Sequence, residues 1–169
     1  MISVLIPSYN NVKTLPMAIA SVLQANSVNE VIIIDDNSND ETKVLVNSIK
    51  NSTDKVKYFR NNKSVGSGLS FVKALKNSLS PFVLTLDPNN FVNPVGIDNL
   101  MDFLLKNNLE VAYGKMAIKK DSGIFEYTHP GNVESDYVSN RNELKDLFVY
   151  GMYMPSFGTI INKKKIIDF

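Results

Sequence analysis

The stretch VIIIDDNSNDE at residues 31–41 decides the fold class of this chain, because a buried strand ends there in two adjacent carboxylates. Residues 31–34 are all β-branched and form the continuous apolar run that is typical of a strand covered on both faces. Asp35 and Asp36 follow at its carboxyl end. In open α/β sheets, ligands bind at this edge. The stretch therefore predicts a ligand site where the strand ends.

A strand and a helix precede this stretch, and a second helix follows it. Residues 2–6 are a short apolar run that ends in Pro7-Ser8-Tyr9-Asn10. Thr14 suits the N-cap of a helix, Pro16 is tolerated in the first turn, and apolar residues recur at helical spacing up to residue 23. SNDE at residues 38–41 has the form of a capping box, which predicts a second helix that begins at Ser38.

Strands and helices continue to alternate up to about residue 118. Further strands are expected over residues 56–59, 82–86 and 110–118. Between them, one helix is predicted from Leu69, Val72, Leu75 and Leu79, and another starts at Asn93-Pro94 and is carried by Ile97, Leu100, Met101 and Leu104. Strands that alternate with helices predict a parallel sheet with right-handed crossovers.

The pattern is weaker beyond residue 118. Residues 121–157 mix glycine, proline, tyrosine and charge, and we expect a hairpin, a short helix near residues 143–150 and a mobile loop. Residues 158–162 resemble one more strand, and residues 163–169 the first turns of a helix. Because the chain stops inside an amphipathic element, we expect the native polypeptide to be longer.

Composition indicates one soluble globular domain. The chain has 169 residues, of which 44% are hydrophobic and 21% charged. A net charge of +1 does not favour a nucleic-acid partner. The absence of cysteine excludes disulfides and cysteine metal sites and fits a reducing cytoplasm. There is no signal-peptide pattern, and no apolar run approaches the roughly 20 residues that span a membrane.

Three segments are expected to meet at one edge of the sheet: residues 7–10, Asp35-Asp36, and Asp87-Pro88-Asn89-Asn90. An aromatic ring and two separate carboxylates suit a nucleotide ligand, with one carboxylate for a base N–H and one near a diphosphate. A sugar nucleotidyltransferase would need a glycine-rich basic loop after the first strand, and a dinucleotide dehydrogenase would need G-x-G-x-x-G there. Residues 7–10 contain neither pattern.

These motifs resemble, in order and spacing, those of the family 2 glycosyltransferases of GT-A fold. VLIPSYN at residues 4–10, EVIIIDDNSNDET at 30–42, and LDPNN at 86–90 with Pro94 carry the resemblance, which covers essentially the whole chain. It implies a Rossmann-like, three-layer α/β/α fold with a mainly parallel sheet. Residues 1–169 would form one domain, with the nucleotide-binding part over about 1–118 and the acceptor side over about 119–169.

The resemblance also implies an activity. The family transfers a sugar, with inversion, from a nucleotide-sugar to a glycan, lipid-linked or protein acceptor, usually with Mg²⁺ or Mn²⁺ on the diphosphate. For this chain a UDP-sugar donor and a role in polysaccharide biosynthesis are favoured. A cytoplasmic location is expected, with peripheral association at the inner face of the membrane left open, and the oligomeric state is not predicted.

Positions that match the family motifs are expected to bind the nucleotide. Asp36 would accept a hydrogen bond from the base N3–H, which favours uracil or thymine, and Asp87 would lie near the ribose and the metal. The complete set of expected nucleotide-binding residues is Pro7, Ser8, Tyr9, Asn10, Asp36, Gly66 and Asp87, with Pro7 and Tyr9 on either side of the base. The expected metal ligands are Asp87 and, weakly, Asn89.

Asn89 is the departure with the largest chemical consequence. It stands where the family usually has a metal-coordinating carboxylate. A hard dication prefers anionic oxygen, and an asparagine carbonyl is neutral. A purely structural role for Asn89 and a role as a weak ligand therefore both remain open.

Further departures concern a cation and the catalytic base. The family often carries an arginine where this chain has Phe71, so Lys63 and Lys73 are considered as substitutes. The family's base is a carboxylate expected beyond Phe169. These departures support an alternative to catalysis, namely a degenerate domain that binds a nucleotide-sugar or a partner without turnover.

Overall fold

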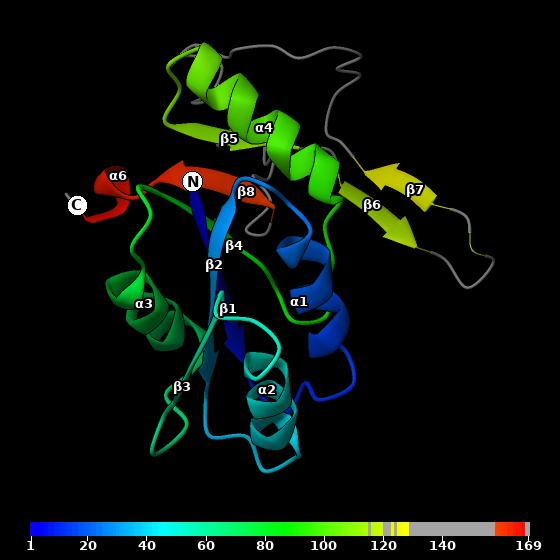
Figure 1. Cartoon of the computed structure of the whole chain (residues 1–169), viewed down its shortest axis with the longest axis vertical. Helices are drawn as coiled ribbons and strands as arrows, with labels where there is room; N and C mark the ends of the chain where they lie inside the picture. Colours follow the sequence, from blue (N-terminus) through cyan, green and yellow to red (C-terminus); the bar gives the residue numbers. More distant parts are fainter. Residues whose placement is uncertain (115, 120–122, 124, 129–157, 168–169) are drawn as a thin grey trace.

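A six-stranded sheet in the order β3-β2-β1-β4-β8-β5 forms the middle layer (Figure 1). The computed structural model describes residues 1–114, 116–119, 123, 125–128 and 158–167. Along the chain, the elements of this sheet and its helices are β1 (Ile2–Ser8), α1 (Leu15–Leu23), β2 (Val28–Asp35), α2 (Thr42–Lys50), β3 (Val56–Arg60), α3 (Ser67–Asn77), β4 (Phe82–Thr85), α4 (Pro94–Lys106), β5 (Val111–Tyr113), β8 (Thr159–Asn162) and α6 (Lys164–Ile167).

The strand order reverses between β1 and β4. Strands β2 and β3 follow β1 on one side, whereas β4 lies on the other side of β1, and all four strands run parallel. The connections after β1 and β4 therefore leave the sheet at a topological switch point. Such points are the usual ligand sites of open α/β sheets. The predicted meeting of residues 7–10 with the segment after β4 thus follows from the topology.

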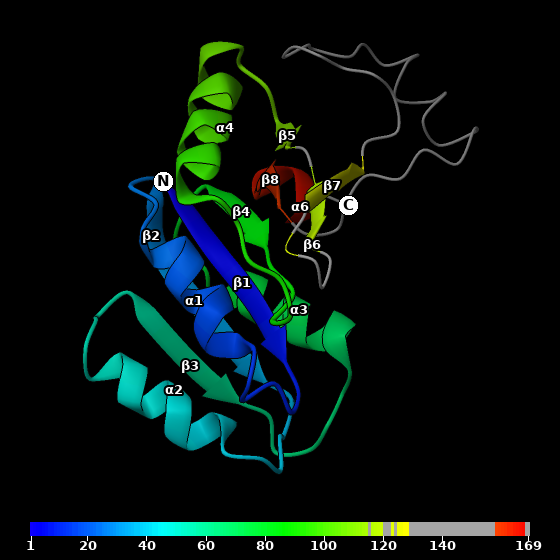
Figure 2. The same ribbon diagram turned by 90° about the vertical axis from the view of Figure 1, so that its right-hand side faces the viewer.

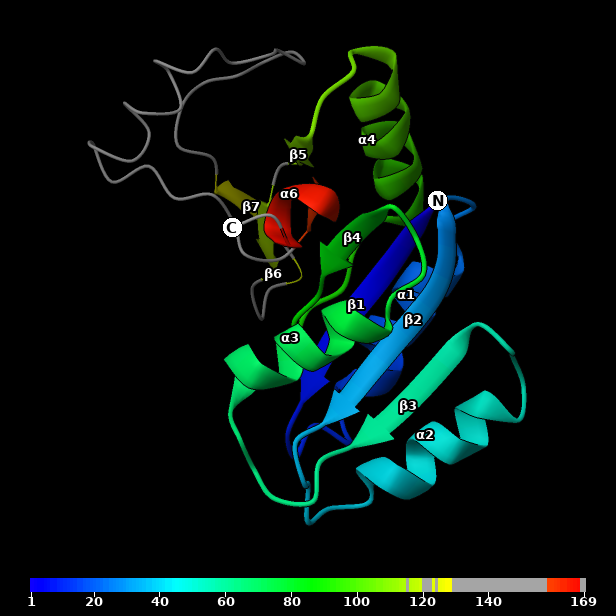
Figure 3. The same ribbon diagram turned by 90° about the vertical axis from the view of Figure 1, so that its left-hand side faces the viewer.

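Helices cover both faces of the sheet, which confirms the three-layer prediction. Helices α1, α2 and α4 cover the face of the sheet to which Val31 and Ile33 point (Figure 2). Helix α3 packs on the other face, where Ile32 and Ile34 contact Ala74 (Figure 3). Because successive strand residues point to opposite faces, a strand buried on both sides must be apolar throughout.

The strand expected over residues 110–118 is two strands in two different sheets. β5 ends at Tyr113, just before Gly114, and glycine weakens a strand because it has no side chain to pack. β6 (Met116–Lys119) then pairs with β7 (Phe125–Thr128) as a separate antiparallel hairpin. β8 runs antiparallel to both β4 and β5. The helix expected near residues 143–150 and the mobile loop lie outside the described residues.

The predicted capping box is wrong. Helix α2 begins at Thr42, and its N-cap, Glu41, makes no side-chain cap hydrogen bond. The Ser38 hydroxyl instead accepts a hydrogen bond from the backbone N–H of Asn10, at 2.9 Å. Thr14 does occupy the N-cap of α1, but its side chain makes no cap hydrogen bond either. Both hydroxyls are used by neighbouring loops, which the local sequence does not reveal.

The third helix is present as α3, but of the four apolar residues that predicted it only Leu75 is buried, and Leu79 lies beyond its end. Leu69, Val72 and Leu79 are 62%, 40% and 74% exposed. The buried residues of α3 are Ser70, Ala74 and Leu75. Small side chains on that face let the helix approach the sheet closely, which a search for large apolar residues does not detect.

Helix α4 begins as predicted from Asn93-Pro94. The Asn93 side chain accepts hydrogen bonds from the backbone N–H groups of Val95 and Gly96, and Pro94 occupies the first turn. α4 is 13 residues long. None of the described helices has both the length and the apolar composition needed to cross a membrane.

We predict that Asn93→Ala lowers the free energy of unfolding by about 1 kcal/mol, because two N–H groups at the start of α4 lose their acceptor. Glu41→Ala is the matched control, since Glu41 is also an N-cap but makes no such hydrogen bond. Urea unfolding followed by circular dichroism measures both changes. Equal effects of the two substitutions would contradict the capping role of Asn93.

Candidate functional site

The loops after β1 and β2 are joined by hydrogen bonds at the carboxyl edge of the sheet. The Asp36 N–H donates to the Ser8 carbonyl at 2.8 Å. The Asn10 N–H donates to the Ser38 hydroxyl at 2.9 Å, and the Asn39 N–H donates to the Asn10 side-chain oxygen at 2.9 Å. These contacts place residues 7–10 beside the carboxylate pair, as the sequence predicts.

Asparagine makes the tight turns in both loops possible. Asn10 and Asn37 have φ angles of 56° and 68°, in the left-handed region that asparagine adopts more readily than most residues. Asn10 therefore shapes the connection between the loops, and its side-chain oxygen is engaged by Asn39. Binding of a nucleotide by Asn10 remains a prediction.

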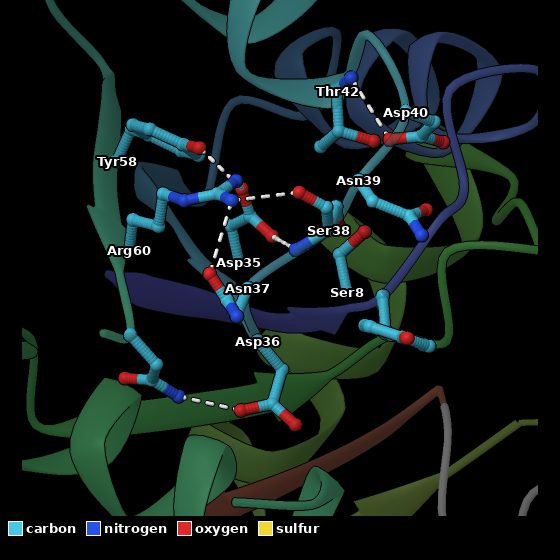
Figure 4. Close-up of polar contacts among 12 residues, drawn as sticks. Ser8, Asp35, Asp36, Asn37, Ser38, Asn39, Asp40, Thr42, Tyr58 and Arg60 are labelled. Atoms are coloured by element: carbon cyan, nitrogen blue, oxygen red, sulfur yellow. Dashed lines mark hydrogen bonds and ion pairs between the residues drawn. The ribbon is translucent and has the colours of Figure 1, made fainter. Parts of the chain in front are cut away.

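Asp35 is fully buried and is held by three donors from two elements. It accepts hydrogen bonds from the Ser38 N–H at 2.7 Å, from the Tyr58 hydroxyl, and from the Arg60 guanidinium at 2.6 Å (Figure 4). Burial alone would raise its pKa, but these hydrogen bonds outweigh burial and hold the pKa below its usual range. Burial and the Asp35 carboxylate raise the pKa of Tyr58 to about 12. Asp35 is thus an ionised structural anchor.

Arg60 is a cation at this edge that the sequence reasoning missed. It lies on β3 directly opposite Asp35 in the strand register. Its second guanidinium nitrogen donates to the Asn37 side chain at 3.1 Å and to the Ser38 carbonyl at 2.7 Å. The position of Arg60 at the end of β3, beside a strand that ends in aspartate, is the signal that would have identified it.

Asp36 points away from Asp35 and is 4% exposed (Figure 4). Its oxygens accept hydrogen bonds from five groups, at 2.7 to 3.3 Å: the side chains of Asn61, Ser64 and Ser70 and the backbone N–H groups of Val65 and Gly66. Burial raises its pKa, but the donors, led by Asn61, bring the pKa far below the usual value. A carboxylate offers about four lone-pair positions. A base N–H would therefore have to replace one of these donors.

Gly66 contributes to this arrangement through its backbone. Its φ angle is 89°, a backbone conformation that residues other than glycine rarely adopt. In this conformation its N–H donates to Asp36 at 2.8 Å, just before α3 begins. The geometry explains why glycine is needed here, while direct nucleotide contact by Gly66 remains a prediction.

The positions considered for a substitute cation differ in their surroundings. Phe71 is partly buried and packs against the core beneath α3. The Lys73 ammonium donates to the Asn61 side-chain oxygen at 2.7 Å and to the Arg60 carbonyl at 3.3 Å. Lys63 is exposed. Lys73 therefore orients Asn61, which in turn donates to Asp36.

The aromatic ring expected beside the base is accessible. Tyr9 is 51% exposed, Pro7 is partly buried, and Ser8 is 3% exposed. The Tyr9 N–H and the Ser8 hydroxyl donate to the Asn11 side-chain oxygen, at 3.0 and 3.3 Å. The Tyr9 ring is thus accessible while the Tyr9 backbone is held by a hydrogen bond. Ser8, in contrast, is buried, and its hydroxyl is hydrogen-bonded.

The segment after β4 brings Asp87 and Asn89 to the same edge, and both are exposed. Asp87 Oδ1 accepts a hydrogen bond from the Asn89 N–H at 2.8 Å. Asn89 Oδ1 accepts from Asn11 at 3.2 Å and from the Thr14 hydroxyl at 3.0 Å. Within the described residues, no group of three or more His, Cys, Asp or Glu side chains is arranged to hold a metal ion. To bind a metal ion, Asn89 Oδ1 would have to release these two donors, so a ligand role for Asn89 remains a prediction.

A sequence model of glycosyl transferase family 2 matches residues 3–168. The chain belongs to this family. Poly(ribitol-phosphate) beta-N-acetylglucosaminyltransferase TarP of Staphylococcus aureus is 29% identical over 98% of this chain and 51% of its own length. UDP-Glc:alpha-D-GlcNAc-diphosphoundecaprenol beta-1,3-glucosyltransferase WfgD of Escherichia coli is 29% identical over 73% of this chain and 49% of its own length. The chain thus spans about half the length of these two relatives.

The GT-A fold expected from the resemblance is confirmed. The crystal structure of residues 1–349 of S. aureus TarS in complex with UDP superposes with a TM-score of 0.75, and the match covers 99% of this chain and 48% of that crystallised chain. At 21% identity this likeness concerns the fold.

We predict that acid destabilises the chain through its hydrogen-bonded carboxylates. Folding lowers the pKa of Asp36, so its contribution to stability is complete above the unfolded-chain value of about 3.9 and is lost as pH falls below it. Asp36→Asn should lower the free energy of unfolding at pH 7 by about 1–3 kcal/mol. The difference between this variant and the original chain should shrink as pH falls.

Urea unfolding followed by circular dichroism, from neutral pH down into this acidic range, measures both effects. Asp54→Asn is the matched control, because Asp54 is exposed. A difference between the Asp36 variant and the original chain that stays constant with pH would contradict the prediction.

Proposed function

We propose that this chain is the donor-binding part of an inverting glycosyltransferase that uses a UDP-sugar. One observation carries the proposal: in a family 2 chain, an exposed Tyr9 ring, an ionised Asp36 and an exposed Asp87 follow three parallel strands at one switch point. The name of WfgD supports a sugar donor activated by UDP, and the names of WfgD and TarP support a lipid-linked or polymeric acceptor.

Each proposed contact has a physical basis. Tyr9 presents an aromatic face on which a uracil ring stacks. Asp36 accepts the uracil N3–H once the Ser64 hydroxyl, which now occupies Oδ2 at 2.7 Å, turns away. Asp87 offers an exposed carboxylate to the ribose hydroxyls. Together these three residues would recognise the nucleoside and place the sugar and its diphosphate at the switch point.

Inversion requires a single displacement at the anomeric carbon. The acceptor oxygen forms the new glycosidic bond while the bond to UDP breaks, and a base removes the acceptor's proton. We propose that this base and much of the acceptor site belong to residues outside the described part of the chain. A lipid-linked acceptor, as in the name of WfgD, would place the reaction at the cytoplasmic face of a membrane.

A second candidate function is nucleotide-sugar binding without turnover. It is favoured by the hydrogen bonds that occupy Asn89 and by a partly buried phenylalanine, Phe71, at the position where the family often has arginine. Turnover separates the two candidates. Release of UDP from a UDP-sugar by the full-length protein, dependent on an acceptor, would eliminate the non-catalytic alternative.

We predict that the full-length protein binds UDP and UDP-sugars in calorimetric titrations and binds CDP and GDP more weakly. An ionised Asp36 accepts a hydrogen bond from uracil N3–H but faces only a lone pair on cytosine N3. The measurement is one titration series with the four nucleotide classes under identical conditions. If none of them binds at millimolar concentration, the proposed function is wrong.

The ratio of UDP to CDP affinity tests the assignment of Asp36. We predict that Asp36→Asn lowers this ratio by about tenfold or more, because an amide can serve cytosine as a donor. Ser64→Ala is the matched control, since it removes one donor to Asp36 but keeps the carboxylate. It should retain the ratio and bind UDP at least as well as the original protein. Equal loss of discrimination in both variants would assign base selection to the loop over residues 64–66.

A further inference from the structure

Asn89 connects the segment after β4 to the segment after β1. Its side-chain oxygen accepts from Asn11 Nδ2 at 3.2 Å and from Thr14 Oγ1 at 3.0 Å, across 78 and 75 positions of sequence. The oxygen of the same Asn11 side chain accepts from the Tyr9 N–H at 3.0 Å. A continuous chain of hydrogen bonds therefore runs from Asn89 to the backbone of Tyr9.

This arrangement conflicts with a ligand role for Asn89. To bind a dication, its carbonyl oxygen would have to release two donors, and the Thr14 hydroxyl and the Asn11 amide would each lose an acceptor. In return it would offer a neutral oxygen, which a hard cation prefers less than a carboxylate. The nearby Asp87 would be the single anionic protein ligand from this segment. The donor set therefore favours the hydrogen-bonded state of Asn89.

The connection to Tyr9 gives Asn89 a different task. Tyr9 is half exposed, so the interior does not pack its ring into a fixed place. Its backbone is fixed by Asn11, and Asn11 is held in turn by Asn89. A change at Asn89 would thus act on the aromatic face that contacts the base, at a distance from the diphosphate.

We propose that Asn89 is a positioning residue for the loop after β1 that carries Tyr9 (the Tyr9 loop). We also propose that this chain binds its nucleoside diphosphate without a divalent ion held by Asn89. The inference rests on the proposed function, since it assumes that a uridine nucleotide binds at this edge. It gives Asn89 an indirect part in recognition of the nucleoside, through Asn11 and Tyr9.

The first test compares UDP affinity of the full-length protein in EDTA and in Mn²⁺ by calorimetry. The two UDP affinities should differ by less than about threefold, because the side chain at position 89 does not bind the ion. Asn89→Asp keeps an acceptor for Asn11 and Thr14 but adds a negative charge, and it should make UDP binding at least about tenfold tighter in Mn²⁺ than in EDTA.

Two outcomes of this comparison are decisive in different ways. UDP binding that Mn²⁺ strengthens by tenfold or more, with Asn89→Ala removing the gain, would overturn the inference while leaving the proposed function intact. Absence of UDP binding in both EDTA and Mn²⁺ would overturn the proposed function and the inference together.

The second test uses uridine 5′-monophosphate in EDTA, followed by NMR titration. This ligand lacks the diphosphate, so loss of a metal ligand would leave its affinity unchanged. A positioning role instead predicts that Asn89→Ala weakens both this ligand and UDP by the same factor, about fivefold or more. Thr14→Val, which removes one of the two donors to Asn89 and nearly keeps the side-chain shape, should shift both affinities in the same direction.

Asn90→Ala is the matched control, because Asn90 is the neighbour of Asn89 but its side chain has no hydrogen bond to the described residues of the Tyr9 loop. It should leave both affinities unchanged. An Asn89→Ala variant that binds the monophosphate as well as the original protein does would show that Asn89 does not position the base-binding loop.

Discussion

The buried carboxylate of Asp36 is the interaction on which the candidate site depends. Taking an ionised carboxylate out of water costs several kcal/mol unless hydrogen bonds compensate. Here Asn61, Ser70 and the loop over residues 64–66 supply them. The Asp36 carboxylate thereby holds together the end of β2, the end of β3 and the start of α3. The connection between β3 and α3 must follow a defined path, and Gly66 is the residue that makes this path accessible.

The two adjacent aspartates have different roles at the sheet edge. Asp35 is neutralised by Arg60 and holds the turn at Ser38, so it stabilises the loop from within. Asp36 has no ion pair among the described residues and is satisfied by neutral donors, some of which a ligand can replace. A carboxylate surrounded by neutral donors keeps more of its attraction for an incoming N–H than one that is paired with a cation. The neighbouring charges therefore have different consequences for binding.

Several elements follow from sequence patterns alone because they depend on local or periodic physics. The β-branched run before Asp35 marks a strand buried on both faces, and Asn93-Pro94 marks the start of α4; both are confirmed. Other expectations fail where tertiary contacts compete with local ones. Ser38 has the form of a helix cap, yet its hydroxyl bonds to Asn10 in another loop. Leu69 and Val72 of α3 are exposed, because the small side chains of Ser70 and Ala74 face the sheet.

The sequence by itself determined the family, the alternation of strands and helices, and the sheet edge at which polar residues collect. The order of the motifs along the chain and the hydrophobic period carry that information. Only the tertiary structure decided which partners those residues have. It brought Arg60 to Asp35, enclosed Asp36 with donors from the next loop, and joined Asn89 to Asn11 and Thr14. Hydrogen bonds between residues that are distant in sequence have no periodic signature, because their geometry exists only after the sheet has brought the strand ends together.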